Sequence, residues 1–311
     1  MRWADVVHIC DHSNSFYTKH MRSVPHIVTC HDLLAVRSAL GEIPENRTRW
    51  TGRQLQRMIL NGLKEAQHIA CVSEATRRDL LRIASIPAGR VSRIYNSLNY
   101  PYKPMEKHEA APRLQKLRVD PNQSFLLHVG GNQWYKNRLG VLRIFSQVIK
   151  RPVKHNLNLV MVGKPWTPDM RRFVDAHGMN NVAIELTEVG DEDLRALYST
   201  ARMLLFPSLQ EGFGWPIIEA QSCGCPVLTS DRPPMDEVGG SAAIYIDPEK
   251  PELAALTLEA ALSRNLFARE PSLENAARFN ESTMIDSYLF LYDRVQKQLC
   301  GSSVEPVTTS D

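Results

Sequence analysis

The chain has 311 residues, of which 43% are hydrophobic and 23% are charged, an ordinary globular composition with enough length for two domains. No run of about 18 apolar residues occurs, which argues against a spanning helix, and Met1 leads straight into strand-like sequence without a secretory signal. The net charge of +3 is uneven: residues 1–110 hold 16 Lys/Arg and 10 Asp/Glu, a balance of +6, whereas the remainder holds 21 and 24, a balance of −3.

A basic first part suits contact with an anionic membrane or an acidic acceptor, and it equally suits an ordinary solvated surface. The six cysteines stand at positions 10, 30, 71, 223, 225 and 300, with no CxxC pair. Cys223 and Cys225 are only two apart, which does not match the ligand spacing of usual zinc sites. We therefore expect reduced thiols in a cytoplasmic protein.

The first hundred residues alternate between strand-like and helix-like patterns. Apolar, β-branched segments between polar turns predict strands at residues 4–10, 25–32, 68–73 and 91–98. The segment 49–67 predicts a helix, and the residues expected on its buried face are Leu55, Met58, Ile59, Leu63 and Ala66. A second helix is expected directly after Ser73, which suits the N-cap position.

Residues 99–123 hold four prolines and no sustained period, which indicates a linker. Beyond it, the same patterns predict strands at 124–131, 157–164, 182–186, 202–208, 226–231 and 242–247. Helices are predicted at 139–150, 168–177, 191–201, about 216–223, 251–263 and 282–299.

Strands that alternate with helices indicate an α/β fold of two Rossmann-like parallel-sheet lobes facing a cleft. The expected domains are a shortened first lobe at 1–100, a linker at 101–123, a second lobe at 124–280, a closing helix at 281–300 and a flexible tail at 301–311. The closing helix is a candidate to return to the first lobe. Ligands are expected at the carboxyl ends of the strands, the usual place in open α/β sheets.

The segment QEGFGWPIIEAQSCGCPV, from Gln210 to Val227, predicts a short helix with defined ends. Pro216 suits the first helical position because its φ is preset and it has no amide hydrogen to satisfy. Gly224 is placed to end the helix, and Pro226 prevents its continuation. We therefore interpret the Cys-Gly-Cys-Pro run as a helix stop.

The start of that helix predicts an anion site, because the first amides of a helix lack intrahelical partners and lie at its positive end. Glycines beside them permit a close backbone approach. The residues concerned are Gly212, Phe213, Gly214 and Trp215. Phosphate is the natural guest of such a site.

Two carboxylates flank this site and would repel phosphate if they pointed at it. Glu219, one turn into the helix, is placed to accept hydrogen bonds from a diol, and Glu211, before the turn, is placed to face a second polyhydroxyl group. A ligand that presents a diol, a diphosphate and a polyol in sequence is a nucleotide sugar. The alternative is that both glutamates are surface acids at a helix start, where acids are favoured.

A second loop supports the same ligand. The strand at 124–131 ends at Gly130 and Gly131, and Lys136 and Asn137 follow. A lysine on a glycine-bounded loop at the carboxyl end of a strand is placed to neutralise a diphosphate. For this stretch alone, a solvated loop lysine is an equally good interpretation.

The segment FPSLQEGFGWPIIEAQSCGCPVLTSD (206–231) resembles the donor-site signature of retaining GT-B glycosyltransferases of family 4, the glycosyl transferases group 1. The spacing of Glu211 and Glu219 matches their paired glutamates. LHVGGNQWYKN (127–137) resembles their phosphate-binding loop, and ACVSEATRRDLL (70–81) and IYNSL (94–98) resemble landmarks of their first lobe. The resemblance covers roughly residues 4–299.

This resemblance implies roles for individual residues. Glu219 corresponds to the ribose-binding glutamate and Glu211 to the glutamate that contacts the transferred sugar. Phe213 and Gly214 offer amides to sugar and phosphate, and Lys136 binds the diphosphate. The resemblance also implies that His31 lines the acceptor side near the anomeric carbon, although a lone histidine at a strand end is more often structural.

The sequence departs from the family pattern in two ways. Gly131 and Tyr135 stand where the family often has arginines, and Arg138 is a substitute only by proximity. The chain also begins at a segment that family members usually reach after further strands and helices. We expect a start upstream of Met1, a fragment or a reduced form.

The family implies transfer of a hexose from a UDP-, GDP- or ADP-sugar to a glycan or lipid-linked saccharide, with retained configuration, in polysaccharide biosynthesis. No cofactor and no nucleic-acid partner are expected. No metal is expected either, because protein groups supply the positive charge and Asp191–Asp193 suit a helix start better than a metal site. We also expect a cytoplasmic location, peripheral at the inner membrane face through the basic first lobe. The alternatives are an epimerase or phosphorylase on the same fold and a non-catalytic nucleotide-sugar-binding or partner subunit.

Overall fold

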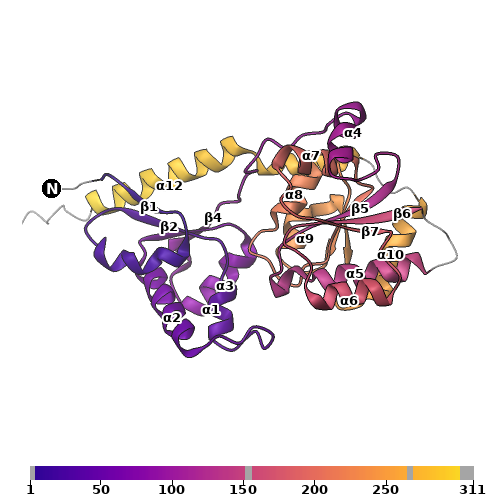
Figure 1. Ribbon diagram of the computed structural model, residues 1–311. Coiled ribbons are helices and arrows are strands. Elements are labelled where there is room, and N and C mark those ends of the chain that lie inside the picture. Colours follow the sequence, from indigo (N-terminus) through magenta and orange to yellow (C-terminus); the bar gives the residue numbers. More distant parts are fainter. Residues whose placement is uncertain (1–3, 151–155, 265–268, 302–311) are drawn as a thin grey trace, which may run out of the picture. The chain divides into compact units, whose positions relative to one another are not determined.

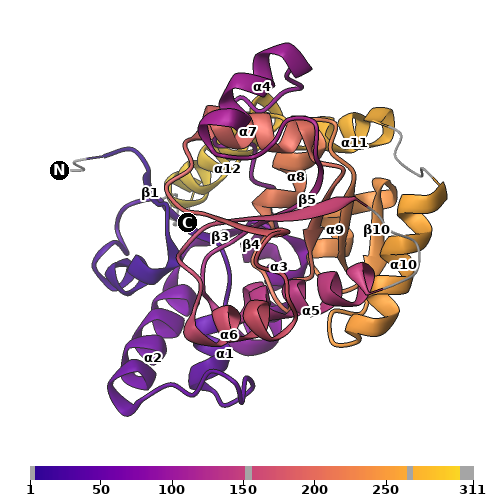
Figure 2. The same ribbon diagram turned by 45° about the vertical axis from the view of Figure 1, so that its right-hand side comes forward.

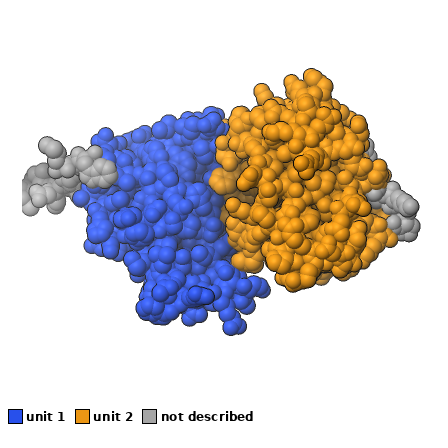
Figure 3. All heavy atoms as spheres, viewed as in Figure 1, with its two compact units in different colours: residues 1–97, 281–311 blue, residues 98–280 orange. Residues whose placement is uncertain are grey.

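The computed structural model describes residues 4–150, 156–264 and 269–301. The chain forms two compact units: unit 1 is residues 1–97 with 281–311, and unit 2 is residues 98–280 (Figure 3). Each unit holds its own parallel sheet. The flexible tail predicted from Gly301 falls on 302–311, outside the described residues.

Unit 1 is built on a four-stranded parallel sheet of order β1-β2-β3-β4. Its strands are β1 (Val7–Ile9), β2 (His26–Cys30), β3 (His68–Cys71) and β4 (Val91–Arg93). Its helices are α1 (Leu34–Ala39), α2 (Trp50–Glu65), α3 (Glu74–Ala84) and α12 (Glu281–Gly301), with 3-10 turns η1 (His12–His20) and η2 (Ala88–Arg90). Helices α1 to α3 lie on one face of the sheet, and α12 lies on the other (Figure 1).

The two faces of this sheet are both apolar, as expected for a parallel sheet covered by helices. Successive side chains of a strand point to opposite faces. Val28 and Ile69 therefore pack with α2 and α3, whereas Ile27 packs with Leu291 and Val295 of α12. The closing helix thus belongs to unit 1, although unit 2 separates it from the rest of that unit in sequence.

Helix α2 confirms the predicted helix but not the whole of its predicted buried face. Ile59 and Leu63 are buried, whereas Leu55 and Met58 are 47% and 48% exposed. Helix α2 packs against η1 at Gly62, where a Cβ atom would collide with the Ser15 carbonyl group. Residues 12–20 show no apolar period that would predict η1, so the side of α2 that η1 covers was not predicted.

Unit 2 is built on a six-stranded parallel sheet of order β10-β9-β8-β5-β6-β7. Its strands are β5 (Ser124–Val129), β6 (Leu157–Val162), β7 (Ala183–Leu186), β8 (Met203–Phe206), β9 (Val227–Ser230) and β10 (Ala243–Ile246). Its helices are α4 (Lys107–Lys116), α5 (Arg138–Ile149), α6 (Pro168–Ala176), α7 (Asp191–Thr200), α8 (Trp215–Ser222), α9 (Met235–Gly239), α10 (Pro251–Arg264) and α11 (Arg269–Ala276), with 3-10 turns η3 (Trp134–Lys136), η4 (Gly240–Ala242) and η5 (Ala277–Phe279).

Helices α5, α6 and α10 cover one face of this sheet, and α7, α8 and α11 cover the other (Figure 2). The chain starts in the middle of the sheet at β5, adds β6 and β7 on one side, and then returns to add β8, β9 and β10 on the other. The direction in which successive strands are added to the sheet therefore reverses between β5 and β8. Ligands of open parallel sheets bind at such a switch point, beside the carboxyl ends of the strands.

The segment expected to be a linker is part of unit 2. Residues 107–116 form α4, and Met105 and Ala110 pack against Ala196 of α7. Pro112 lies inside this short helix and interrupts the pattern that usually identifies a helix. Helices α1, α9 and α11 were also missed, because helices of five to eight residues are too short to show a helical period.

Candidate functional site

Two loops meet at the switch point of unit 2: one follows β5 and the other follows β8. Lys136 of the first loop donates from Nζ to Oε1 of Glu211 on the second, at 2.8 Å. The two side chains are only 16% and 8% exposed. Ser208 donates its hydroxyl to the same oxygen at 2.8 Å. The structure thus brings together the lysine and the glutamate that the sequence placed on separate motifs.

The loop after β5 is tightly packed. Gly163 has a φ of +145°, and a side chain there would collide with the Gly130 carbonyl group. A Cβ atom on Gly130 would lie 3.4 Å from the Lys136 side chain, and one on Gly131 would meet Gln133. These glycines therefore let the loop fold back over its own lysine.

Asn137 ties this loop to neighbouring ones. Its φ is +50°, and it stands at the N-cap of α5. The side-chain amide donates to the carbonyl groups of Pro207, at 3.0 Å, and Pro248, at 3.4 Å. Asn137 was predicted to bind the donor, but its side-chain amide nitrogen is engaged by these two backbone carbonyl groups.

Helix α8, Trp215–Ser222, lies within one residue of its predicted bounds, with Pro216 as its second residue rather than its first. Gly214 stands at its N-cap with a φ of +100°, and Pro216 lies in its first turn. Gly224, with a φ of +71°, follows its last turn. Phe213 is buried and packs edge-on against Trp215 and Phe279, with ring centroids 6.1 and 5.6 Å apart. The turn before the helix is therefore anchored by an aromatic side chain.

The two cysteines after α8 are buried, and burial raises the pKa of the Cys223 thiol to about 12. A protonated, buried thiol is a poor nucleophile. This agrees with the interpretation of Cys-Gly-Cys-Pro as a helix stop.

Glu219 is buried inside unit 2 and accepts a hydrogen bond from the Tyr198 hydroxyl at 2.8 Å. The pKa of Glu219 is raised to about 7, chiefly by burial and to a smaller extent by the nearby Asp191, whereas the Tyr198 hydrogen bond and the Lys136 charge oppose the rise. The carboxyl group changes its charge state near neutral pH.

Sequence reasoning missed Tyr198. It is fully buried on α7, and Tyr102 packs edge-on against its ring at 5.7 Å. A buried tyrosine usually finds a partner for its hydroxyl group, and Glu219 is that partner. A lone tyrosine among the apolar residues of α7 was the available signal.

Arg138, the substitute cation suggested by proximity, is 4% exposed and supports the loops. Its Nη1 donates to the Lys164 carbonyl at 2.6 Å and to the Asn132 side chain. Its Nε and Nη2 atoms are buried and have no partner among the described residues. Burial lowers the pKa of Arg138.

His31 belongs to unit 1, where it follows β2. Its Nε2 atom makes a hydrogen bond with the Cys10 carbonyl group at 2.9 Å. Its amide donates to Nδ1 of His12 at 3.4 Å, and burial lowers the pKa of His12. The remaining predicted site residues all belong to unit 2.

The acidic run Asp191–Asp193 forms the first turn of α7, as expected. Asp193 accepts from Arg113 and Lys116, each at 2.9 Å. In the described ranges, no group of three or more His, Cys, Asp or Glu side chains is placed to hold a metal ion.

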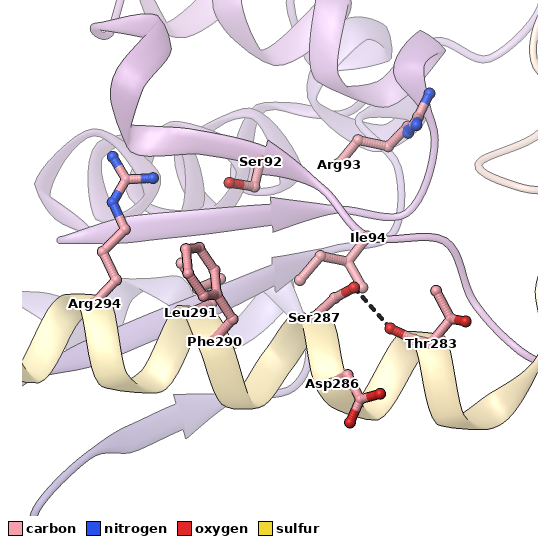
Figure 4. A pocket seen from close by; sticks show the side chains of 9 residues that line it. All are labelled: Ser92, Arg93, Ile94, Thr283, Asp286, Ser287, Phe290, Leu291 and Arg294. Carbon is pink, nitrogen blue, oxygen red and sulfur yellow. Dashed lines mark hydrogen bonds between the residues drawn. The ribbon is translucent and has the colours of Figure 1, made fainter.

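Two hollows lie among the described residues of unit 1, and neither is lined by a predicted site residue. One, of about 430 Å³, lies where Phe290, Leu291 and Arg294 of α12 approach Ser92 and Ile94 (Figure 4). The other, of about 510 Å³, lies between α1 and α2. Within the described part of the chain, no helix has the length and apolar character needed to cross a membrane.

Comparison with known proteins identifies two family models along the chain. The glycosyl transferases group 1 model matches residues 112–282, and the glycosyltransferase family 4 model matches residues 2–100. The first match contains Lys136, Glu211 and Glu219.

Two curated bacterial relatives are similar in sequence. The O-antigen chain mannosyltransferase B of Escherichia coli is 31% identical over 239 residues, which are 76% of this chain and 61% of that protein. The O-antigen chain mannosyltransferase RfbU of Salmonella typhimurium is 28% identical over 195 residues, 62% of this chain and 50% of that protein. The matched part thus spans only half to three fifths of these relatives.

Among solved structures, Anabaena HepE in complex with UDP-glucose has a TM-score of 0.73 and 16% identity. The match covers 96% of this chain and 78% of that one. This likeness confirms the predicted fold class, a GT-B protein with two Rossmann-like lobes.

Proposed function

Because the chain belongs to the glycosyl transferases group 1 family, we propose that it transfers a hexose from a nucleotide diphosphate sugar to a hydroxyl group with retained anomeric configuration. The observation that carries this proposal is the Lys136–Glu211 pair at the switch point of unit 2. Its two loops border the N-terminus of α8, the helix that holds Glu219. The activity, the substrates and the partners are all proposed.

The proposed diphosphate site consists of Lys136 and the N-terminus of α8. A partly buried ammonium group and the positive end of a helix both stabilise the charge that develops on a leaving nucleoside diphosphate. Each preorganised donor of this kind contributes about 2.7–4 kcal/mol in comparable anion sites. We propose that this protein charge takes the place of a metal ion, which a chelator control tests.

The two glutamates are proposed to hold the ends of the donor. Glu219 accepts hydrogen bonds from the ribose diol, and Tyr198 orients its carboxyl group through the 2.8 Å hydrogen bond. Glu211 faces the transferred sugar and is aligned by Lys136 and Ser208. In this proposal, His31 of unit 1 lines the acceptor side.

The names of the two bacterial relatives suggest mannose as the sugar. We propose a mannosyl donor and an acceptor that is a glycan or a lipid-linked saccharide of polysaccharide biosynthesis. The five described free cysteines agree with the reducing cytoplasm as the site of action.

The test incubates the full chain with UDP-, GDP- and ADP-sugars, mannose donors included, in the presence and absence of a chelator. Released nucleoside diphosphate is measured, and NMR assigns the anomeric configuration of the product. Glu211→Gln is expected to abolish release, whereas the exposed control Glu252→Gln on α10 retains it. An inverted product or a strict metal requirement would contradict the mechanism.

The same samples separate the alternatives. Release of sugar 1-phosphate only when phosphate is added would identify a phosphorylase. A donor-induced rise in melting temperature without turnover would identify a binding subunit. If no donor raises the melting temperature and none is turned over, the proposed function is wrong.

A further inference from the structure

Helix α12 carries exposed apolar side chains on its outward side. Phe290 is 72% exposed, and Leu289 and Ile285 are 55% and 44% exposed. Ile285 and Leu289 are one helical turn apart and Phe290 adjoins Leu289, so the three side chains are neighbours on the helix surface. A contiguous group of exposed apolar side chains, unlike a single one, is typical of an interaction surface.

These side chains adjoin the hollow between α12 and β4. The hollow has a volume of about 430 Å³, and Phe290 lies in its wall beside Leu291 and Ile94 (Figure 4). All the residues that line it belong to unit 1. The hollow therefore leaves room beside the Phe290 ring for an apolar side chain of another molecule.

Two charged residues flank Phe290 along α12. Asp286 precedes Phe290 by four residues, Arg294 follows it by four, and both line the hollow. Steps of four residues keep side chains on one side of a helix, with about 6 Å of rise between them. Along the helix, the row therefore presents an acid, an aromatic ring and a base, with the ring at its centre.

Neither charge is neutralised within the part of the chain that the structure describes. Asp286 makes no side-chain hydrogen bond or ion pair there, and Arg294 donates only to the Gly89 carbonyl group, at 3.1 Å. The helix dipole does not account for them, because its effect is confined to the first and last turns and α12 extends from Glu281 to Gly301. The two charges are thus available to a binding partner.

The inward side of α12 is fixed to unit 1. Leu291 and Val295 pack against Ile27 of β2. The hydroxyl groups of Tyr288 and Thr29 form a hydrogen bond of 2.9 Å. Packing therefore holds the outward row in place before any partner arrives, which lowers the entropy that binding would cost.

The row is complementary to a second copy of itself. When two antiparallel α12 helices are related by a two-fold axis through Phe290, Asp286 of one chain lies opposite Arg294 of the other, because each is four residues from the axis. The symmetry forms this contact twice, and the two Phe290 rings meet between the charge pairs. In a parallel pair, identical residues would face each other and like charges would repel.

We propose that α12 is the contact surface of a homodimer, in which a second copy of this chain packs its own α12 antiparallel across Phe290. The rings and the hollow form the apolar centre of the interface, and the Asp286–Arg294 pairs form its polar rim. A small apolar ligand would fill the hollow but leave both charges unpaired, whereas a second copy accommodates the ring and the charges. The surface lies in unit 1, and the inference goes beyond the proposed transferase activity.

Sedimentation velocity of the full chain over a range of concentrations tests the proposal. We expect a monomer–dimer equilibrium for the unmodified chain. Asp286→Arg and Arg294→Asp each replace two attractive contacts by two repulsive ones, and each is expected to weaken dimerisation on the order of 30-fold. This loss should become smaller as salt rises, because ions screen the charges.

The two charge variants should also compensate for each other. The double variant Asp286→Arg/Arg294→Asp exchanges the charges and is expected to dimerise like the unmodified chain. A mixture of the two single variants is expected to form a heterodimer, because each chain carries the charges that pair with those of the other. The exposed control Glu252→Arg on α10 changes the net charge as Asp286→Arg does and should leave the dimer intact.

Phe290→Ala tests the apolar centre of the interface. It is expected to weaken dimerisation on the order of 100-fold, because central aromatic side chains carry much of the binding energy of an interface. This loss should persist at high salt. Trp50→Ala on α2 removes an aromatic ring of equal exposure, 72%, and should leave the dimer unchanged. Melting curves confirm that each variant is folded.

Three results would overturn the proposal. The first is an unmodified chain that remains monomeric at every concentration up to its solubility limit. The second is a double charge variant that dimerises as weakly as the single variants, which would show that Asp286 and Arg294 do not pair. The third is a dimer that Phe290→Ala leaves unchanged, which would place the contact elsewhere on the chain.

Discussion

Helices α8 and α2 differ in how far their side chains are buried. In α8, the residues from Ile217 to Ser222 are all buried, and Glu219 is held by packing and by one hydrogen bond. In α2, the basic side chains are exposed, and contacts on the opposite side of the helix anchor it to unit 1. Substitutions in the buried helix change packing and hydrogen bonds, whereas those on the exposed side of α2 change mainly the surface charge. Single substitutions should therefore act strongly around α8 and weakly on α2.

The largest effect is expected from Lys136→Met. It leaves Glu211, 8% exposed, without its cation, and breaking a buried pair on one side costs about 3–5 kcal/mol. Urea denaturation measures the loss in the free energy of unfolding. Lys107→Met, on the exposed surface of α4, is the control and should change little. Equal losses in the two variants would remove the distinction between buried and exposed charge.

Glu219→Gln should change how stability depends on pH. The pKa of Glu219 is about 7 in the folded protein, against an ordinary value of 4.5 for a glutamate. Because the unfolded chain releases this proton first as pH rises, the group lowers stability progressively between these values, by about 3 kcal/mol in total. The glutamine variant lacks this decline. Thermal unfolding across the same pH range measures the difference, and a pH-independent difference would contradict the assignment.

Tyr198→Phe removes the hydrogen bond to Glu219 and should cost about 1–3 kcal/mol. It should also raise the pKa of Glu219 further, because the lost bond favoured the carboxylate. The pH at which donor affinity reaches half of its maximum, measured by calorimetry, should then be higher. Tyr245→Phe loses a hydroxyl that donates to the Gly240 carbonyl and should leave this midpoint pH unchanged. An unchanged midpoint pH in Tyr198→Phe would show that the hydroxyl does not act on Glu219.

Gly224→Ala tests the end of α8. Its φ of +71° is unfavourable for alanine, and the substitution should cost about 1–2 kcal/mol in thermal unfolding. Gly190→Ala has open space around it and an ordinary φ, so it should cost less. A neutral Gly224→Ala would mean that the helix stop tolerates a side chain.

The smallest effect, and one of opposite sign, is expected on α2. Arg57→Gln relieves repulsion from Arg53 and should raise the free energy of unfolding by about 0.2–0.5 kcal/mol. Arg82→Gln on α3 should instead lower it slightly, because Arg82 pairs with Glu42 at 2.7 Å. A destabilised Arg57→Gln would show that this arginine has a structural role.

Much of the fold was predictable because apolar residues recur at a clear helical or strand period in most of the elements. The Lys136–Glu211 pair was less accessible: its members are 75 residues apart, and only the sheet order brings their loops together. Two features lacked a signal in the sequence: the packing of η1, which decides which side of α2 is buried, and the helix around Pro112. A third, the link from Tyr198 to Glu219, had only a weak signal in the lone tyrosine of α7. Each depends on a tertiary contact that no local pattern encodes.

The division of unit 1 into two stretches of chain has a consequence during synthesis. Ile27 and Ala70 are fully buried beneath α12, but that helix leaves the ribosome after all of unit 2. At 5–20 residues per second, the roughly 180 intervening residues keep this apolar face uncovered for about 10–40 s. The nascent chain therefore completes its first unit last, and the emerging protein is most open to chaperones and aggregation on that face.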